Sequence, residues 1–257
     1  MKSIFLAAVL VAAWPLAGFA QTDTTDQPQA DSEFAGDYKV ADQFQAALKA
    51  DDRKAMAALI AYPLSREAPL TPITKAEDFV AHWDEFFDAA TTKELLDGKA
   101  EQYGWRGIAL DNGRVWFGQG HVVSIFTETA AGKQALANAK LAESKTLYPS
   151  VRGYTKVAFV CSTSTLNVRT QYHGKDLRYF AWKQKAAYST KPDIELHGGT
   201  YDPQGTGGNF ILSFKNRGFS YVWEVGHNLC GEDCNDYLEV MKGKKMVSRQ
   251  VCTEAKD

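Results

Sequence analysis

The chain has 257 residues, 45% of them hydrophobic and 23% charged, which is enough for one large globular domain or two small ones. Its 29 Lys and Arg against 31 Asp and Glu give a net charge of -2 without any arginine-rich stripe, which argues against nucleic acid as a partner. Residues 21–150 carry 13 basic and 20 acidic side chains and residues 151–257 carry 15 and 11, a contrast that favours two domains.

The first twenty residues have the pattern of a secretory signal peptide. Lys2 precedes an apolar run from Ile4 to Leu16, and the exit Gly18-Phe19-Ala20 contains small residues. The run is shorter than the ~20 residues that a spanning helix needs, and no later segment approaches that length, so we expect no membrane span. We expect a periplasmic or secreted protein. Residues 21–34 are polar and predict a flexible leader.

Residues 35–128 predict an α+β domain that begins with helices. Four apolar residues of the first helix fall on one face, from Val40 to Leu48, and Asp51 or Asp52 can cap a second helix. Thr74-Lys75-Ala76-Glu77 matches a capping box, which predicts one strong helix with an aromatic stripe that extends to Phe87.

Strands follow these helices. Asn112-Gly113 tolerates positive backbone angles and predicts a two-residue hairpin within Trp105–Phe117. Another strand is expected from Val122 to Phe126. An Ala- and Lys-rich stretch then predicts a linking helix within residues 129–150, which ends at Tyr148-Pro149-Ser150.

Residues 151–257 predict a small all-β domain, either a barrel or a sandwich, because short β runs alternate with turn residues. Asn216-Arg217-Gly218 and Lys242-Gly243-Lys244 have the composition of hairpin turns. The expected strands are Tyr154–Cys161, Leu166–Tyr172, Leu177–Trp182, Phe210–Phe214, Phe219–Val225, Tyr237–Met241 and Met246–Cys252.

The four cysteines of an exported chain are expected to form disulfides. Cys161 ends the first strand of the β domain and Cys252 ends the last, so a bridge between them would join the two ends of the domain. Cys230 and Cys234 are expected to close a local loop, although the other pairings remain open. His227 beside this loop could form a zinc site with both cysteines, but oxidation competes, and we expect no metal and no cofactor.

No catalytic constellation is apparent. The histidines are scattered, and no H-E-x-x-H, G-x-S-x-G or S-x-x-K motif occurs. A helix packed across a curved sheet can leave a cavity at its open end, so the aromatic side chains of this region are candidates for a ligand pocket, with core packing as the alternative. The candidate ligand-binding residues are Trp83, Phe87, Trp105 and Trp116.

Two segments resemble known families. Tyr62-Pro63-Leu64 and the runs over 79–87 and 104–117 resemble a recurring exported bacterial variety of the nuclear transport factor 2-like superfamily. This resemblance implies a cone-shaped domain with a helix on a curved sheet. The frame of Phe159-Val160-Cys161 and Val251-Cys252 is similar in outline to the periplasmic inhibitors of c-type lysozyme, although their Ser-Gly-x-x-Tyr loop is absent.

Three classes of function follow. The absence of a catalytic constellation favours an envelope protein that binds a small molecule, a glycan or a protein. The second resemblance implies an inhibitor or immunity protein of a cell-wall hydrolase such as a lysozyme. The first implies a small-substrate isomerase or dehydratase that uses the cone cavity.

Overall fold

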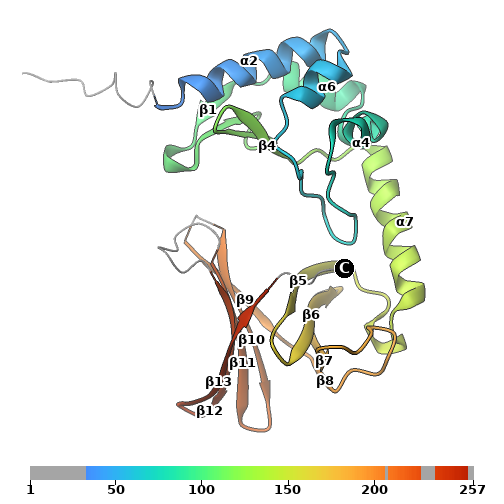
Figure 1. The fold of residues 1–257 in the computed structure, drawn as a ribbon, viewed down its shortest axis with the longest axis vertical. Helices are drawn as coiled ribbons and strands as arrows, with labels where there is room; N and C mark the ends of the chain where they lie inside the picture. The colour runs from blue at the N-terminus through green and yellow to red at the C-terminus, as the bar shows by residue number, and fades with distance from the viewer. Residues whose placement is uncertain (1–32, 206–207, 227–234, 254–257) are drawn as a thin grey trace, which may run out of the picture. The chain divides into compact units, whose positions relative to one another are not determined.

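The computed structural model describes residues 33–205, 208–226 and 235–253. These residues form helices and three antiparallel sheets, which confirms the predicted α+β class (Figure 1). The predicted signal peptide, most of the leader and the His227, Cys230 and Cys234 group lie outside the described residues.

The first region consists of five α-helices, the short 3₁₀ turn η1 (Gly104–Arg106) and a four-stranded sheet in the order β1-β2-β3-β4. The helices are α2 (Ala35–Lys49), α3 (Arg53–Ala58), α4 (Ala76–Ala81), α5 (Trp83–Phe86) and α6 (Ala89–Asp97). The strands are β1 (Ala100–Gln102), β2 (Ile108–Leu110), β3 (Val115–Gly118) and β4 (His121–Ile125). Because α2 contacts β2, β3 and β4, the buried face of this helix and one face of the sheet form a single core, in which Phe44 and Phe117 are almost fully buried.

The apolar face of α2 and the cap of α3 are as the sequence predicts. The buried side chains of α2 include Val40, Phe44 and Leu48. Asp52 caps α3, since its Oδ1 accepts a hydrogen bond from the backbone N–H of Ala55 at 2.9 Å.

The predicted capping box and the single helix after it are wrong. Lys75 occupies the cap position of α4 and no side chain caps that end. The helix breaks at His82, whose φ of -101° and ψ of 15° leave the helical region and whose Nδ1 lies 2.8 Å from the carbonyl oxygen of Asp78. A second break follows at Phe87, which is extended because Asp88 caps α6 through the N–H of Thr91 at 2.8 Å. Two short helices therefore replace the predicted long one.

The predicted hairpin joins β2 to β3, but its turn is longer than two residues. Leu110 pairs with Val115, so four residues form the loop. Asp111, Asn112 and Gly113 all have positive φ, at 49°, 55° and 90°. The sequence therefore predicts the site of the turn correctly and its length incorrectly.

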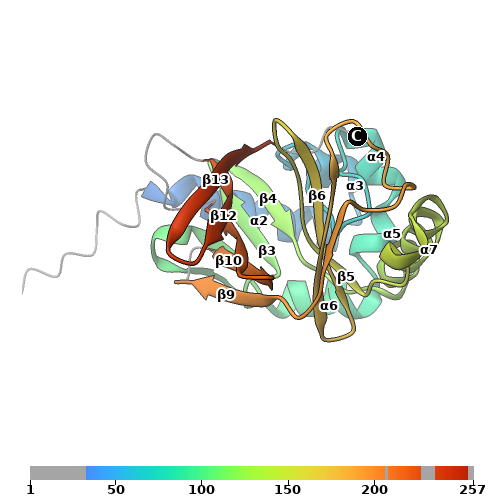
Figure 2. The same cartoon turned by 90° about the horizontal axis from the view of Figure 1, so that it is seen from below.

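Residues after β4 form the linking helix and two further sheets (Figure 2). The predicted helix is α7 (Ala130–Thr146), which leads to the short 3₁₀ turn η2 (Pro149–Val151). One sheet has the order β5-β6-β7-β8, with β5 (Lys156–Ser162), β6 (Leu166–His173), β7 (Asp176–Lys183) and β8 (Ile194–Leu196). The other has the order β13-β12-β11-β10-β9, with β9 (Thr200–Gln204), β10 (Asn209–Asn216), β11 (Phe219–Val225), β12 (Asp236–Lys242) and β13 (Lys245–Cys252).

The seven predicted strands of this region all form, and two more were not predicted. β8 is only three residues long, and β9 is exposed along its length and contains Pro203. Proline is tolerated there because β9 is the edge strand of its sheet. β8 is too short for its alternation to be recognised, and β9 lacks the apolar alternation that identifies the other strands.

The predicted bridge between Cys161 and Cys252 is confirmed, with the two Cα atoms 5.6 Å apart. It lies beside an isolated antiparallel pairing of Ser162 with Thr253. Between the two sheets is a hydrophobic core in which Trp223 and Tyr179 are fully buried. The disulfide therefore joins the first and last strands at the margin of this core.

The other face of β6 carries a buried polar network. The guanidinium of Arg169 donates to the Glu143 carboxylate of α7 at 2.7 and 2.8 Å and to Gln171 Oε1 at 2.5 Å. It also lies 4.7 Å from the centre of the Tyr154 ring, and the Tyr154 hydroxyl donates to Glu143. Burial, followed by the interaction with Glu143, raises the pKa of Tyr154, so the phenol stays protonated and acts as a donor. Gln171 Nε2 lies 2.8 Å from His173 Nε2 and extends the network.

Candidate functional site

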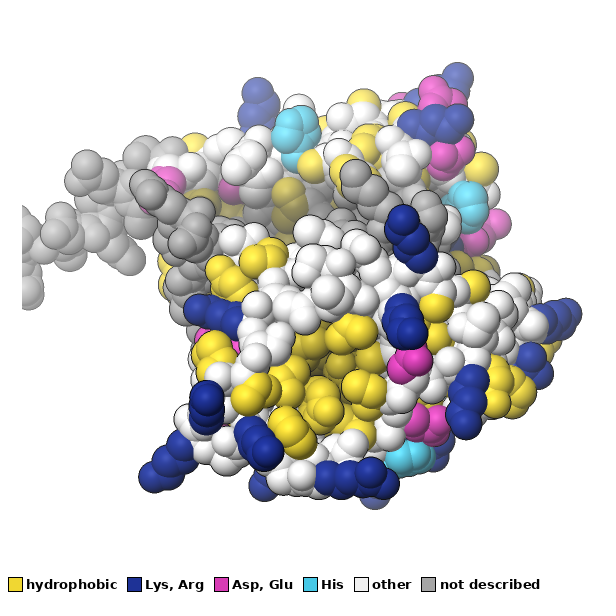
Figure 3. Space-filling model, turned by 60° about the horizontal axis from the view of Figure 1, so that its bottom comes forward, with side chains coloured by type: hydrophobic (Ala, Val, Ile, Leu, Met, Phe, Trp, Pro, Cys, Tyr) yellow, Lys and Arg dark blue, Asp and Glu magenta, His cyan; other side chains and the backbone are white. Residues whose placement is uncertain are grey.

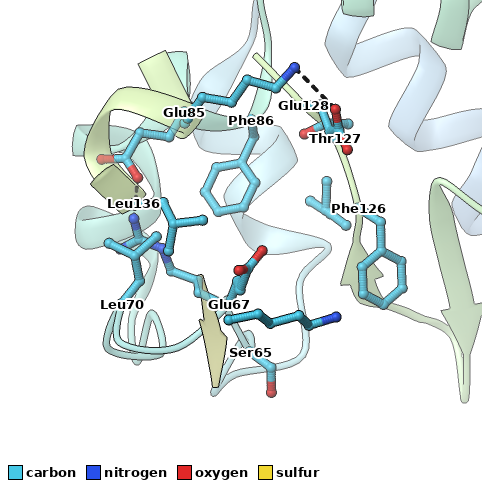
Figure 4. Close-up of a pocket in the computed structure, with 14 residues that line it drawn as sticks. Ser65, Glu67, Leu70, Glu85, Phe86, Phe126, Thr127, Glu128 and Leu136 are labelled. Carbon is cyan, nitrogen blue, oxygen red and sulfur yellow. Dashed lines mark hydrogen bonds and ion pairs between the residues drawn. The ribbon is translucent and has the colours of Figure 1, made fainter. Parts of the chain in front are cut away.

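A pocket of about 630 Å³ lies beside α5 and the first turns of α7 (Figure 4). In Figure 4, Leu70 and Leu136 lie on one side of Phe86 and Glu67, and Phe126 lies on the other. The lining residues are Ser65, Arg66, Glu67, Leu70, Glu85, Phe86, Ile125, Phe126, Thr127, Glu128, Gly132, Lys133, Leu136 and Lys156.

Thr129 holds the start of α7 against α5. Its hydroxyl lies 3.0 and 2.9 Å from the carbonyl oxygens of Asp84 and Glu85, to which it donates, and it accepts from the N–H of Gly132 at 2.9 Å. Gly132 is required by this close approach, because a Cβ there would lie 2.5 Å from the Glu85 carbonyl oxygen. The first turns of α7 therefore form a fixed wall of the pocket, to which Leu136 belongs.

The apolar part of the pocket continues the core of the first region. Phe86 and Ile125 are each only 7% exposed and reach the pocket from that core. Phe126 follows β4 directly and is 64% exposed, a large value for a phenylalanine that borders a cavity. An apolar ligand would bury this ring, and its binding would be favoured in proportion to the apolar area removed from water.

Arg66 gives the pocket a nearly buried cation. Its side chain is 7% exposed, and its guanidinium is hydrogen-bonded to the carboxylate of Glu85, which is 21% exposed. Among the described residues, Glu85 is its only hydrogen-bond partner. A guanidinium carries five N–H donors in a fixed fork, so donors remain that can bind an acceptor in the pocket.

The other charged side chains of the lining are largely paired. Glu128 lies 3.1 Å from Lys133, and Glu67 lies 3.2 Å from Lys140, which is outside the lining. Lys156 is exposed and has no ion-pair partner within the described part of the chain. Within the lining, the three cations Arg66, Lys133 and Lys156 balance the three acids Glu67, Glu85 and Glu128, and the one extra positive charge beside the pocket is that of Lys140.

Thr127 supplies an unused polar atom. Its Oγ1 is buried and has no hydrogen-bond partner among the described residues. Buried hydroxyls normally have a partner, either in the protein or in ordered water. This oxygen has almost no accessible surface, so the polar position of the pocket that could orient a ligand is the guanidinium of Arg66.

The structure does not bring the four predicted ligand-binding residues into one site. Trp83 and Phe87 have ring centroids 4.5 Å apart and lie in the core of the first region. Trp116 packs against Tyr103 with a centroid separation of 5.5 Å, and Trp105 is 57% exposed. None of these four lines the pocket.

Sequence reasoning missed the pocket because its walls come from the segment after Leu64, the end of β4 and α7. One signal was available. Arg66 is the only basic residue between Lys54 and Lys75, in a stretch that is otherwise largely apolar.

The described lining residues of the pocket form no catalytic arrangement. Its acids each have a basic partner, and no nucleophile lies hydrogen-bonded to a base among the lining residues. Within the described ranges, no group of three or more His, Cys, Asp or Glu side chains is placed to hold a metal ion. None of the described helices combines the length and apolar character needed to cross a membrane.

Comparison with known proteins yields no relative. No family model matches the chain, and neither a curated protein nor a solved structure matches it.

Proposed function

We propose that this is an exported binding protein whose pocket takes a small amphipathic molecule with an apolar body and a single anionic group. The observation that carries the proposal is Arg66, a nearly buried guanidinium with one carboxylate partner at the wall of an apolar pocket. A carboxylate or sulfonate can accept the remaining N–H donors, and charge-assisted hydrogen bonds of this kind are about twice as strong as neutral ones.

The size and charge of the pocket support this ligand class. A volume of about 630 Å³ falls within the roughly 300–1,000 Å³ typical of small-molecule sites. The excess of one positive charge among the neighbouring side chains would be balanced by one anionic group. The exposed ring of Phe126 would lose its contact with water when the apolar body binds.

We further infer the finer architecture. The helix-on-sheet core of the first region supports a cone-shaped domain of the nuclear transport factor 2-like kind. In the second region, strands that are consecutive in the chain pair with each other, except that β8 and β9 belong to different sheets. The Ser162–Thr253 pairing and the disulfide join the first strand to the last. This supports a closed barrel. Export is supported by the signal-peptide pattern of residues 1–20.

The proposal is tested with two fluorescent probes that differ by one charged group. 8-Anilinonaphthalene-1-sulfonate has an aromatic body with a sulfonate, and N-phenyl-1-naphthylamine has the same body without it. The purified protein is expected to bind the sulfonate more tightly. In Arg66→Met/Glu85→Gln, which removes both charges of the pair, the preference for the sulfonate should fall by about tenfold, as expected for a lost charge-assisted bond of roughly 1.5 kcal/mol.

Two substitutions on α7 distinguish probe binding in the pocket from probe binding elsewhere on the surface. Leu136→Ser removes a lining side chain, whereas Leu141→Ser changes an exposed leucine, 63% accessible, that does not line the pocket. Leu136→Ser should weaken both probes, and Leu141→Ser should leave them unchanged. Equal effects of the two serines, or an unaltered probe preference without Arg66, would refute the proposal.

A further inference from the structure

Two hairpin turns lie side by side at one end of the β9–β13 sheet. β10 and β11 are joined at Arg217-Gly218, and β12 and β13 are joined at Gly243-Lys244. Because β11 pairs with β12 and Phe219 stands opposite Lys242, the register brings these two turns together. We call residues 215–219 and 241–247 the hairpin end.

The hairpin end is basic and free of acids. No Asp or Glu occurs in either segment, and within the described residues its basic side chains make no ion pair. Five basic residues, all exposed, belong to it: Lys215, Arg217, Lys242, Lys244 and Lys245. In the sequence the first two lie 25 or more positions before the other three, and only the pairing of β11 with β12 brings the two groups together.

Apolar side chains are exposed among these charges. Met246 is 45% exposed and Val247 is 47% exposed, and the two are adjacent in β13 at a β-bulge, where Val247 has no partner in β12. Phe219 is partly exposed and lies 5.5 Å from the Lys242 ammonium. Figure 3 shows the molecule from the end that carries these turns, where Lys and Arg side chains stand around an area of apolar ones.

We propose that the hairpin end docks onto the surface of a bilayer that contains anionic lipids. The negative charge of the bilayer surface complements the five unpaired basic side chains, since each Lys or Arg near an anionic leaflet strengthens attachment. An acidic polymer would pair with the basic side chains but would leave the apolar ones exposed to water. A bilayer interface also accommodates the exposed apolar side chains of Met246 and Val247, which selects the bilayer as the partner.

The test is co-sedimentation of the whole protein with vesicles of phosphatidylcholine alone and of phosphatidylcholine mixed with phosphatidylglycerol. Binding is expected only to the mixed vesicles and should weaken as salt is added. Lys242→Ala/Lys244→Ala/Lys245→Ala should bind about 100-fold more weakly, from about fivefold for each charge. The matched control, Lys183→Ala/Lys185→Ala/Lys191→Ala, removes three exposed lysines outside the hairpin end and should change binding less than about twofold.

A second pair of measurements separates a bilayer from an acidic polymer. Met246→Ser/Val247→Ser should weaken binding to the mixed vesicles several-fold and leave binding to heparin, a soluble acidic polymer, unchanged. If these serines have no effect on vesicles, or if the two lysine variants behave alike, the proposal is overturned. An unchanged tryptophan fluorescence spectrum establishes that each variant is folded. The result does not depend on the pocket, because probe binding at Arg66 is measured separately.

Discussion

Glu143→Ala should be one of the most destabilising single changes on the surface of this protein. The Glu143 carboxylate accepts two hydrogen bonds from Arg169 and one from Tyr154, and the Arg169 side chain is only 3% exposed. Alanine is the best helix former, so the change costs α7 nothing in propensity. It leaves a buried guanidinium without its counter-ion, which costs about 3–5 kcal/mol.

Urea unfolding followed by tryptophan fluorescence measures this loss, with Trp182 as a reporter that is buried in the adjoining cluster. Asp97→Ala serves as the control, because it removes a carboxylate from an exposed helical pair with Lys93 and should cost no more than about 0.5 kcal/mol. Glu143→Ala/Arg169→Met should recover much of the stability, since no unpaired charge remains. If Glu143→Ala lowers the free energy of unfolding by less than about 1 kcal/mol, or by no more than Asp97→Ala does, pairing with Glu143 is not what stabilises the buried Arg169.

Three further changes probe other parts of the structure. Cys252→Ser opens a bridge across 91 residues to Cys161 and should lower the free energy of unfolding by about 4–5 kcal/mol, with no change expected on adding reductant to the variant. Gly132→Ala should lower the free energy of unfolding by about 1–3 kcal/mol and weaken probe binding, because the added Cβ meets a backbone carbonyl of α5. The control Gly36→Ala adds its Cβ in open space, so thermal melts of the two variants should show Gly36→Ala to be neutral or stabilising. Burial and then the charge of a nearby arginine lower the pKa of His173 below its ordinary 6.5, so the unfolded chain binds the proton more readily and stability should fall as pH drops below about 6.5. His173→Asn should lose this part of the pH dependence. If the free energy of unfolding falls equally steeply with pH in the variant and the unaltered protein, the prediction is wrong.

Local signals in the sequence predicted the elements whose causes are local. The apolar face of α2, the Asp52 cap and the turns at Arg217-Gly218 and Gly243-Lys244 each depend on a few neighbouring residues. The capping box failed because the same residues also permit a helix start one position later, at Ala76. The division into domains at residues 129–150 remains a prediction.

The pocket and the hairpin end depend on contacts that no local pattern contains. Arg66 meets Glu85 across 19 residues, and Phe219 stands opposite Lys242 only once β11 and β12 have paired. In the sequence the basic residues of the second half look scattered beside turns. Their gathering is a consequence of register, and register is fixed by the apolar face of the whole sheet.

The sparse burial of α7 has a consequence for its motions. No residue of this helix is buried, so its backbone hydrogen bonds are protected by the attachments at Thr129 and Glu143 and by intrinsic helix propensity. Amide hydrogens in its middle turns should therefore exchange with solvent well before those of α2, which packs on the sheet. A molecule seated against Leu136 would slow that exchange, and the helix would then report occupancy of the pocket without any label.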